Sequence, residues 1–223
     1  MSDKLTVYSP YEKVYDFFGQ SGLDIVPQKL RDYLLVMPSK ECPNPILTNE
    51  NPRVRFVKYL YYDEANPLDL PMPSVEERKA IVFDPYKPDQ PTAKRYRMFT
   101  QMAVNQAEIE GSTICRIVMG KTIPYSPFSA NIGVDFILLS NYSHDSNTKT
   151  TALSRTYSME LCLLEALNGV NIDGVGAFMF SRGVHPDCGS RMIYDEKMNV
   201  GRDVVLAFEA KGGSPNGTSE NFY

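Results

Sequence analysis

The sequence has few of the residues from which catalytic and metal centres are usually built. Histidine occurs twice, as His144 and His185, and the four cysteines are widely spaced with no CxxC pair. Structural zinc normally takes four nitrogen or sulfur ligands, with close spacing in at least one pair. The close pair of His185 and Cys188 has no second pair to complete such a set. We therefore predict no metal ion, no cofactor and no catalytic residues, and we interpret both histidines as loop residues, with a turn built on Pro186.

The sequence also lacks an excess of positive charge and any long apolar run. The 223 residues include 23 basic and 27 acidic side chains, so the formal net charge is −4. A general binder of nucleic acid or of anionic membranes needs a cationic footprint, which this balance does not provide. No apolar run approaches the roughly 20 residues that span a bilayer. Residues 1–13 show no basic stretch followed by an apolar run, so we expect neither a signal peptide nor a membrane partner.

Tryptophan is absent, yet the chain is rich in other residues suited to contacts between proteins. It contains 14 tyrosines, 11 phenylalanines, 10 methionines and 16 prolines. Many prolines fall between residues 38 and 91, interleaved with tyrosine, phenylalanine and leucine. Because such apolar residues favour packing over disorder, we expect ordered loops that wrap over neighbouring surfaces. Cys115 and Cys162 lie inside apolar runs, which predicts free, buried thiols and folding in a reducing environment.

Residues 1–91 are predicted to form an N-terminal part with helices, one strand and proline-rich loops. Capping boxes and helical spacing predict three helices in it, over residues 9–18, 27–37 and 74–82. The run 54–62 is aromatic and β-branched, which predicts a strand. Proline-rich loops are expected on both sides of that strand.

Residues 92–210 are predicted to form an α/β core domain, and residues 211–223 a flexible tail. An amphipathic helix over 92–110 and a strand over 113–119 come first, followed by a turn-rich loop to Ala130. The expected elements after that loop are a strand at 132–140, a helix ending at Leu167, and strands at 175–184 and 201–209.

The strand at 132–140 is apolar on both faces, which is typical of a central strand. We expect Thr148 or Thr150 to cap the helix that follows. Its apolar stripe is predicted at Leu153, Tyr157, Leu161 and Leu164. The fold class is therefore α/β of the α+β type: a mostly antiparallel sheet with a long helix packed on one face, and an N-terminal helical, proline-rich extension.

Three short motifs suggest chemistry, and each has a simpler interpretation. Gly120-Lys121-Thr122 looks like the end of a phosphate-binding loop, but the preceding glycine of that motif is missing and no helix follows. A small hydrolase using His185 with a neighbouring serine and aspartate is an alternative that lacks a nucleophile-elbow motif. A nucleic-acid-binding module using the Arg53–Tyr62 strand is a second alternative, because cations alternate there with aromatic residues.

The layout from Ile132 to Glu209 resembles the tail-completion and head–tail connector proteins of tailed bacteriophages. The resemblance lies in the pattern Gly133-Val134-Asp135-Phe136-Ile137-Leu138, which leads through a polar loop to a helix, and in the last strand, Arg202 to Phe208. A second likeness, in residues 57–84, is to virion proteins of short-tailed, crAss-like phages. It consists of a tyrosine-rich strand, an Asn66-Pro67-Leu68 turn and a helix with Arg78 and Lys79.

The resemblance implies a non-enzymatic structural protein of the virion that folds in the bacterial host cytoplasm. Such a protein assembles as a homo-oligomeric ring in the neck, connects portal or adaptor proteins to the tail, and helps retain packaged DNA, with passive DNA contact in the channel. Ring subunits need two different complementary surfaces. We expect contacts with partners in the loop after the 132–140 strand and in the C-terminal tail, at Asn141, Tyr142, His144, Asp145, Asn147, Lys149, Asn221, Phe222 and Tyr223.

Overall fold

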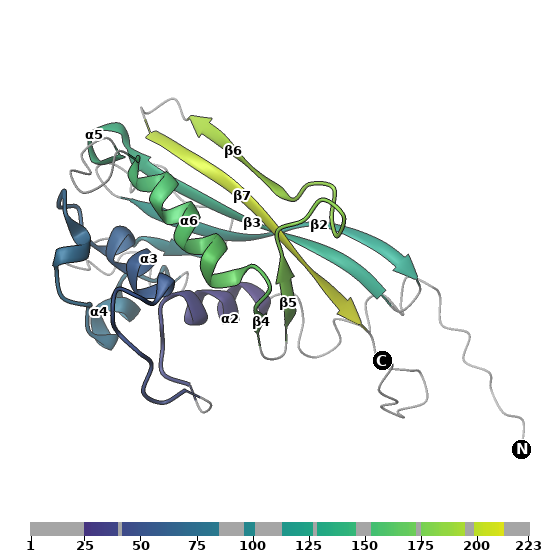
Figure 1. Ribbon diagram of the computed structural model, residues 1–223, viewed down its shortest axis with the longest axis horizontal. Coiled ribbons are helices and arrows are strands. Elements are labelled where there is room, and N and C mark those ends of the chain that lie inside the picture. Colours follow the sequence, from purple (N-terminus) through teal and green to yellow (C-terminus); the bar gives the residue numbers. More distant parts are fainter. Residues whose placement is uncertain are drawn as a thin grey trace, which may run out of the picture.

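The computed structural model describes residues 25–39, 42–84, 96–100, 113–126, 129–145, 153–172, 175–194 and 199–211. Within these ranges the chain is a mixed α/β fold in which helices cover one face of a curled, mostly antiparallel sheet (Figure 1). The predicted helix at 9–18, the tail after Lys211 and the predicted domain boundary at residue 91 lie outside the described residues.

The sheet has seven described strands in the order β1-β2-β3-β7-β5-β4, and β6 also pairs with β7. All pairs are antiparallel except β1 with β2. The strands are β1 (Met98–Phe99), β2 (Ile114–Ser126), β3 (Ser129–Asn141), β4 (Asn171–Ile172), β5 (Gly176–Met179), β6 (Gly189–Tyr194) and β7 (Asn199–Lys211). The far ends of β2, β3 and β7 project beyond the helices (Figure 1).

The described helices come from both halves of the chain. They are α2 (Ile25–Leu34), α3 (Pro52–Tyr61), the 3-10 helix η1 (Pro67–Asp69), α4 (Val75–Ala80), α5 (Tyr142–Asp145) and α6 (Arg155–Leu167). Helix α6 contacts β3 and β7, α3 contacts α6, and α2 contacts β2. None of the helices in the described ranges has the length and apolar character needed to cross a bilayer.

Strand β3 lies at the centre of the sheet, as its sequence predicts. Val134, Phe136 and Leu138 are fully buried and belong to the core cluster beneath the helices. Asp135 and Ile137 alternate with them and lie half-buried on the other face. We call the helix-covered side the inner face of the sheet and the opposite side the outer face.

Helix α6 is shorter than expected, and a different residue caps it. The Ser154 side chain accepts a hydrogen bond from the backbone N–H of Tyr157, so the helix begins at Arg155, whereas Thr148 and Thr150 lie outside the described residues. The predicted stripe is not the buried face, because Leu161 is 42% exposed. The buried apolar face consists of Met159, Cys162, Leu163, Ala166 and Leu167.

The predicted strand at 54–62 is wrong, because this segment is helix α3. Asn51 caps the helix by accepting a hydrogen bond from the Arg53 N–H, and Pro52 occupies the first turn. Val54, Val57 and Leu60 recur at helical spacing and are fully buried. Packing against α6 and the sheet therefore outweighs the β preference of the aromatic and β-branched residues.

Two further predictions around β2 are wrong, and others are confirmed. In the expected helix at 92–110, the described residues 96–100 contain β1 instead, and the rest lies outside the described residues. The expected loop at 120–130 is mostly strand, because β2 continues to Ser126. The helix predicted from Pro27 is present as α2, and the capping box at Ser74 forms as expected at the start of α4.

Three buried arginines, which the sequence patterns did not reveal, hold the helices together by capping their C-terminal ends. Arg78 donates to the carbonyls of Leu35 (2.7 Å) and Val36 just after α2. Arg97 donates to the carbonyl of Leu60 at 2.9 Å and forms a two-point contact with the Asp63 carboxylate. Arg155, at the first position of α6, donates to carbonyls at the end of α3. Each of the three guanidinium groups therefore faces the negative end of a helix dipole. The carbonyls that accept hydrogen bonds from Arg155 are those of Tyr59, Tyr62, Asp63, Glu64 and His144.

Candidate functional site

A β-bulge in β2 shapes the outer face of the sheet. Met119 pairs with Val134 and Thr122 with Ile132, so two residues, Gly120 and Lys121, lie opposite the single residue Gly133. The segment that resembled a phosphate-binding loop is therefore a strand irregularity, with Lys121 exposed.

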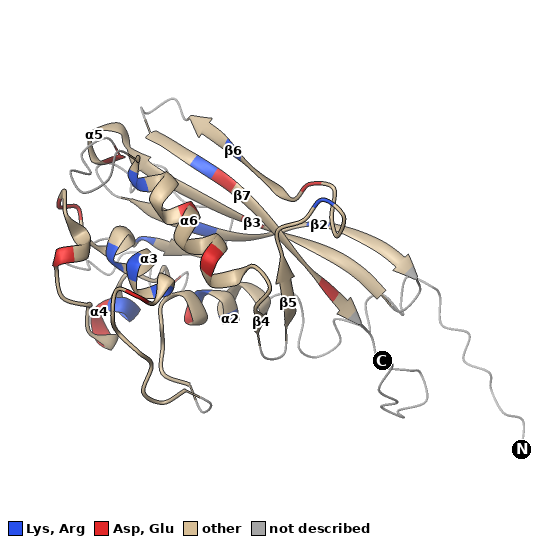
Figure 2. Ribbon diagram, in the orientation of Figure 1, with Lys and Arg blue, Asp and Glu red and all other residues tan. Residues whose placement is uncertain are grey.

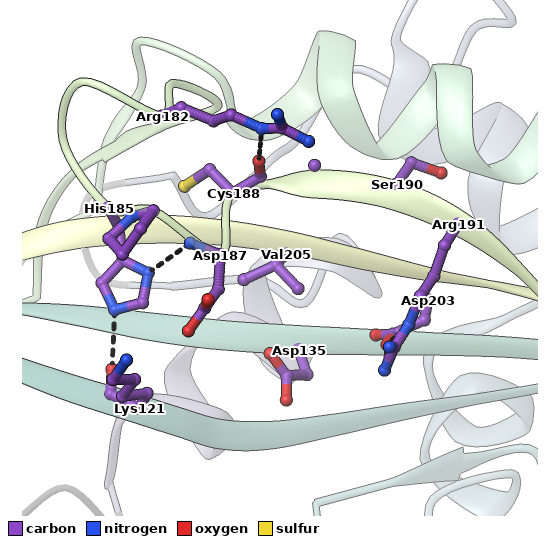
Figure 3. Close-up of a pocket in the computed structure, with 12 residues that line it drawn as sticks. Lys121, Asp135, Arg182, His185, Asp187, Cys188, Ser190, Arg191, Asp203 and Val205 are labelled. Atoms are coloured by element: carbon purple, nitrogen blue, oxygen red, sulfur yellow. Dashed lines mark hydrogen bonds and ion pairs between the residues drawn. The ribbon is translucent and has the colours of Figure 1, made fainter.

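The loop after β5 folds over this bulge and brings His185 onto it. A Cβ atom at Gly133 would approach the His185 ring to 3.3 Å, so glycine provides the space for the ring. His185 Nε2 lies 3.0 Å from the Lys121 carbonyl oxygen, and Nδ1 lies 3.3 Å from the Asp187 nitrogen (Figure 3). Because the backbone N–H of Asp187 donates, Nδ1 accepts and the proton is on Nε2, which donates to Lys121.

Both ring nitrogens of His185 are thus used by the main chain, and the side chain is fully buried. A general base or a metal ligand needs a free nitrogen lone pair. The hydrolase alternative would require His185 to give up one of these hydrogen bonds. Nearby, Cys188 donates weakly to the Met179 carbonyl at 3.6 Å, and burial raises the pKa of its thiol, which keeps it protonated.

A pocket of about 430 Å³ opens beside His185, between this loop, β6 and the outer face of the sheet. Three carboxylates lie in it: Asp135 from β3, Asp203 from β7 and Asp187 from the loop (Figure 3). Lys121, Arg182 and Arg191 also line it, and all three are exposed. We call this space the outer-face pocket.

Cross-strand register explains why these residues meet. Asp135 pairs with Val205, and Arg191 pairs with Asp203, so their side chains share the outer face. Asp203 adjoins Arg202 on β7, where a red and a blue segment touch in Figure 2, but the two side chains point to opposite faces. Arg202 makes an ion pair with Glu160 of α6 on the inner face.

The carboxylates are incompletely neutralised within the pocket. Arg191 donates to Asp203 Oδ2 at 2.9 Å, and the Asp203 side chain is only 10% exposed. The other oxygen of Asp203, Oδ1, is buried and has no hydrogen-bond donor. Burial raises the pKa of the Asp135 carboxyl, and the charges of Asp203 and Asp187 raise it further, against the opposing effect of Arg191.

Gly120 provides the room for Asp135. A Cβ atom at Gly120 would lie 2.9 Å from Asp135 Oδ1, closer than ordinary contacts allow. The bulge therefore does two things for the pocket: its Lys121 carbonyl anchors His185, and its glycine admits a carboxylate.

A second surface lies on the inner face, where side chains of β6 and α6 adjoin Arg202 of β7. Met192 and Tyr194 of β6 are 57% and 69% exposed, and the Tyr194 hydroxyl lies 3.7 Å from the Met192 sulfur. Met192 pairs with Arg202, whose guanidinium lies 4.8 Å from the centroid of the Tyr157 ring on α6. Leu161 follows one turn later. We call Tyr157, Leu161, Met192 and Tyr194 the α6–β6 surface.

The expected partner-contact residues are placed as follows. Tyr142 is exposed, whereas Asp145 is buried and its carboxylate accepts hydrogen bonds from the N–H and hydroxyl of Thr156, both at 2.8 Å. Asn141 accepts from Ser143, and His144 is half-buried. Asn147, Lys149, Asn221, Phe222 and Tyr223 lie outside the described residues.

His144 and His185 are not brought together. The His144 ring faces the Asp63 carbonyl near the end of α3, whereas His185 lies over the bulge in β2. In the part of the chain that the structure describes, no cluster of three histidine, cysteine, aspartate or glutamate side chains could hold a metal ion. All four cysteines are free thiols.

The cations and aromatics proposed for nucleic-acid binding are used inside the fold. Arg53 lies over the Tyr33 ring, 4.3 Å from its centroid, and Arg55 makes an ion pair with Glu165. Lys58 is buried and donates to the Asn49 side chain at 2.8 Å. Phe56, Tyr59 and Tyr61 of this segment are also buried.

Sequence reasoning missed the carboxylates of the outer-face pocket. Asp135 interrupts an otherwise apolar run from Ile132 to Leu139, and that pattern was the signal for a polar group at a half-buried position. Asp203 directly follows Arg202, before the apolar run of β7, and gave no such signal. No protein-family model, curated protein or solved structure matches this chain.

Proposed function

We propose that this protein is a structural protein that assembles with other protein chains through the α6–β6 surface and the free edge of β6. The observation that carries the proposal is the combination, on one short strand, of unpaired backbone groups and exposed apolar side chains. Each of these features favours association, and together they fit the addition of a strand from another chain.

No strand in the described ranges pairs with the outer edge of β6. Among the described residues β6 pairs with β7 alone, through six consecutive residue pairs without a bulge. Alternate residues of an edge strand direct their N–H and C=O groups outward, so about six backbone groups of this strand have no hydrogen-bond partner among the described strands. Proteins commonly protect such edges with proline, charged side chains or a bulge. Strand β6 has no proline and no bulge, and its one charged residue, Arg191, makes an ion pair with Asp203 of β7.

The opposite edge of the sheet provides the contrast. Beyond Arg116, no described strand pairs with the outer side of β2. This edge has the bulge at Gly120, the exposed Lys121 and Pro124, each of which opposes strand addition. Within the described residues the edge at β2 is therefore better protected against strand addition than the edge at β6, which favours β6 as the site of assembly.

The finer proposal is the one that the sequence resemblance implies: a ring-forming connector in the neck of a tailed phage. Its support is the order of elements, in which strand β3 is followed by helix α6 and then by antiparallel strands ending in β7. A ring requires a second, different surface on each subunit. The projecting ends of β2, β3 and β7 offer one that is remote from the helices (Figure 1).

Light scattering coupled to size-exclusion chromatography, over a dilution series of the full chain, tests the assembly proposal. We expect species larger than a monomer for the natural chain, and a shift to the monomer for the double variant M192D/Y194D. Ile46→Asp is the matched control, because Ile46 is 70% exposed in a loop far from β6 in the sequence, and we expect it to assemble normally. A natural chain that is monomeric at every concentration would contradict the proposal.

Electron microscopy tests the finer proposal. Purified protein, alone and mixed with portal, adaptor and tail proteins, should form rings or join the particle, and M192D/Y194D should not. Oligomers that never close and never bind such partners would retain the assembly function but remove the assignment to a neck.

A further inference from the structure

We propose that the outer-face pocket is a binding site for a guanidinium group. The pocket is on the opposite face of the sheet from the α6–β6 surface, so this inference does not depend on the assembly function. It rests on three carboxylates that converge on one space and on the shortage of hydrogen-bond donors directed at them.

The acceptors without donors are one buried oxygen of Asp203, the half-buried carboxylate of Asp135 and the exposed carboxylate of Asp187. Asp203 is buried, and its Oδ1 has no donor even though Oδ2 pairs with Arg191. The carboxylates of Asp135 and Asp187 have no hydrogen-bond or ion-pair partner among the described residues. Buried acceptors without donors are costly and are rare in native proteins. The pocket is therefore complementary to a ligand that brings several donors and a positive charge.

The exposed cations of the pocket do not supply these donors. Arg182 uses its Nε to donate to the Cys188 carbonyl at 3.4 Å, and Lys121 is exposed. Among the described residues, neither cation makes a hydrogen bond or an ion pair with a carboxylate of the pocket. A bound anion would approach the carboxylates of Asp135 and Asp203 directly, and like-charge repulsion opposes that.

A guanidinium suits the pocket better than a metal ion. A metal needs several ligands within about 2–2.6 Å of one point, and no three candidate ligands within the described ranges meet that condition. A guanidinium has five N–H donors spread over a planar fork and can bridge carboxylates that lie farther apart. The volume of about 430 Å³ accommodates the group together with part of its aliphatic stem.

Amide chemical shifts of the full chain provide the test, with N-acetyl-L-arginine methylamide as the probe. We expect saturable shifts at Gly120, Lys121 and Gly189, which border the pocket. The citrulline analogue has the same shape without the charge and should bind at least about tenfold more weakly, because a hydrogen bond to a charged group is worth that factor or more. Equal shifts from both probes would overturn the proposal.

Two variants locate the binding. Asp135→Asn keeps the shape of the side chain and should weaken arginine binding about tenfold. Asp187→Asn changes an exposed loop residue that does not threaten folding, and it should also weaken binding. Glu50→Gln, an exposed carboxylate outside the pocket, is the control and should bind normally. Unchanged affinity in both pocket variants would overturn the assignment.

Two further arms identify the source of the guanidinium and exclude a metal ion. Free L-arginine adds a carboxylate that Lys121 and Arg182 can hold. Tighter binding of free L-arginine than of the blocked form, N-acetyl-L-arginine methylamide, therefore supports a small-molecule ligand. Equal or tighter binding of the blocked form supports an arginine side chain of another protein. Calcium at matched ionic strength should compete weakly, and stronger binding of calcium than of arginine would overturn the proposal.

Discussion

The buried guanidinium of Arg155 offers a sharp test of how the helices are held together. Nη1 donates to the carbonyls of Tyr59, at 3.0 Å, and Tyr62, while Nη2 donates to the carbonyl of Glu64 at 2.7 Å. These carbonyls lie at the C-terminal end of α3, where a helix leaves its last carbonyls without partners. Arg155 is fully buried, and burial lowers its pKa without removing its charge. The variant Arg155→Met keeps an apolar stem and removes every donor.

The expected loss of stability follows from the stranded carbonyls. Each buried acceptor that loses its donor costs about 1–3 kcal/mol. Water can enter the part-buried turn after α3 and donate hydrogen bonds to some of these carbonyls, so their individual losses of stability do not add up. We expect a loss of about 3–5 kcal/mol, which corresponds to two or three of these carbonyls left without a donor. Because whole domains are stable by about 5–15 kcal/mol, this is a large fraction of the total.

Urea denaturation measures the loss, followed by far-UV circular dichroism and tyrosine fluorescence because the chain has no tryptophan. Arg155→Lys should lose less than Arg155→Met, since an ammonium retains up to three donors. Arg182→Met is the control for an exposed arginine and should stay within about 0.5 kcal/mol of the natural chain. A loss below about 1 kcal/mol for Arg155→Met would refute the reasoning, because it would mean that α3 does not need this cap.

Three further predictions concern single residues. Burial raises the pKa of Asp135, so ionisation of this carboxyl opposes folding. Asp135→Asn should therefore raise the urea midpoint of unfolding at pH 7. This increase in stability should vanish below the ordinary aspartate pKa of about 4, where the carboxyl is neutral in both the folded and the unfolded chain. Burial alone would raise the pKa of Asp63, but Arg97 outweighs it and the net shift is downward. Asp63→Asn should therefore lower the free energy of unfolding by about 1–2 kcal/mol above pH 4. The value is modest because the carboxylate is 36% exposed. The difference between the variant and the natural chain should disappear as the pH falls through the pKa of Asp63 in the folded protein. At Gly201 a Cβ atom would overlap the Leu138 carbonyl, so Gly201→Ala should lower the melting temperature sharply or prevent folding, as a thermal scan would reveal.

The sequence predicted those elements whose signals are local. The capping box at Ser74 forms as expected, with the Ser74 hydroxyl and the Glu77 carboxylate each bonding the other residue's backbone N–H. The double-sided apolar pattern of β3 correctly predicts a central strand. In both cases the residues that decide the structure are neighbours in the chain, so one short window contains all the information.

The segment at 54–62 was mispredicted because its local signals conflict. Its aromatic and β-branched residues favour a strand, whereas Asn51 and Pro52 are a helix start. The conflict is resolved by packing on α6, a hundred residues later, and by the arginines that cap the helix end. Neither contact is visible in a local window. The Asn51-Pro52 start is the local feature that indicates the helix.

The outer-face pocket could not be located from spacing, because the residues that form it come from distant parts of the chain. Lys121, Asp135, His185 and Asp203 meet only through the register of β2, β3 and β7 and through the bulge that shifts that register. What the sequence did contain was the anomaly of Asp135 inside the apolar run of β3. A one-residue change of register would have put the carboxylates of Asp135 and Asp203 in the core, so the pocket depends on the sheet as a whole.

The bulge links the two surfaces on which the functional proposals rest. By interrupting β2 at Gly120 and Lys121 it protects that edge from strand addition, whereas β6 has no bulge and no second partner strand among the described residues. The same bulge positions His185 and makes room for Asp135, so it also builds the pocket. Strand β6 borders both surfaces, since Arg191 faces the pocket and Met192 faces the α6–β6 surface. A strand added to the edge of β6 would therefore lie beside Arg191, so assembly there would place a partner chain next to the pocket.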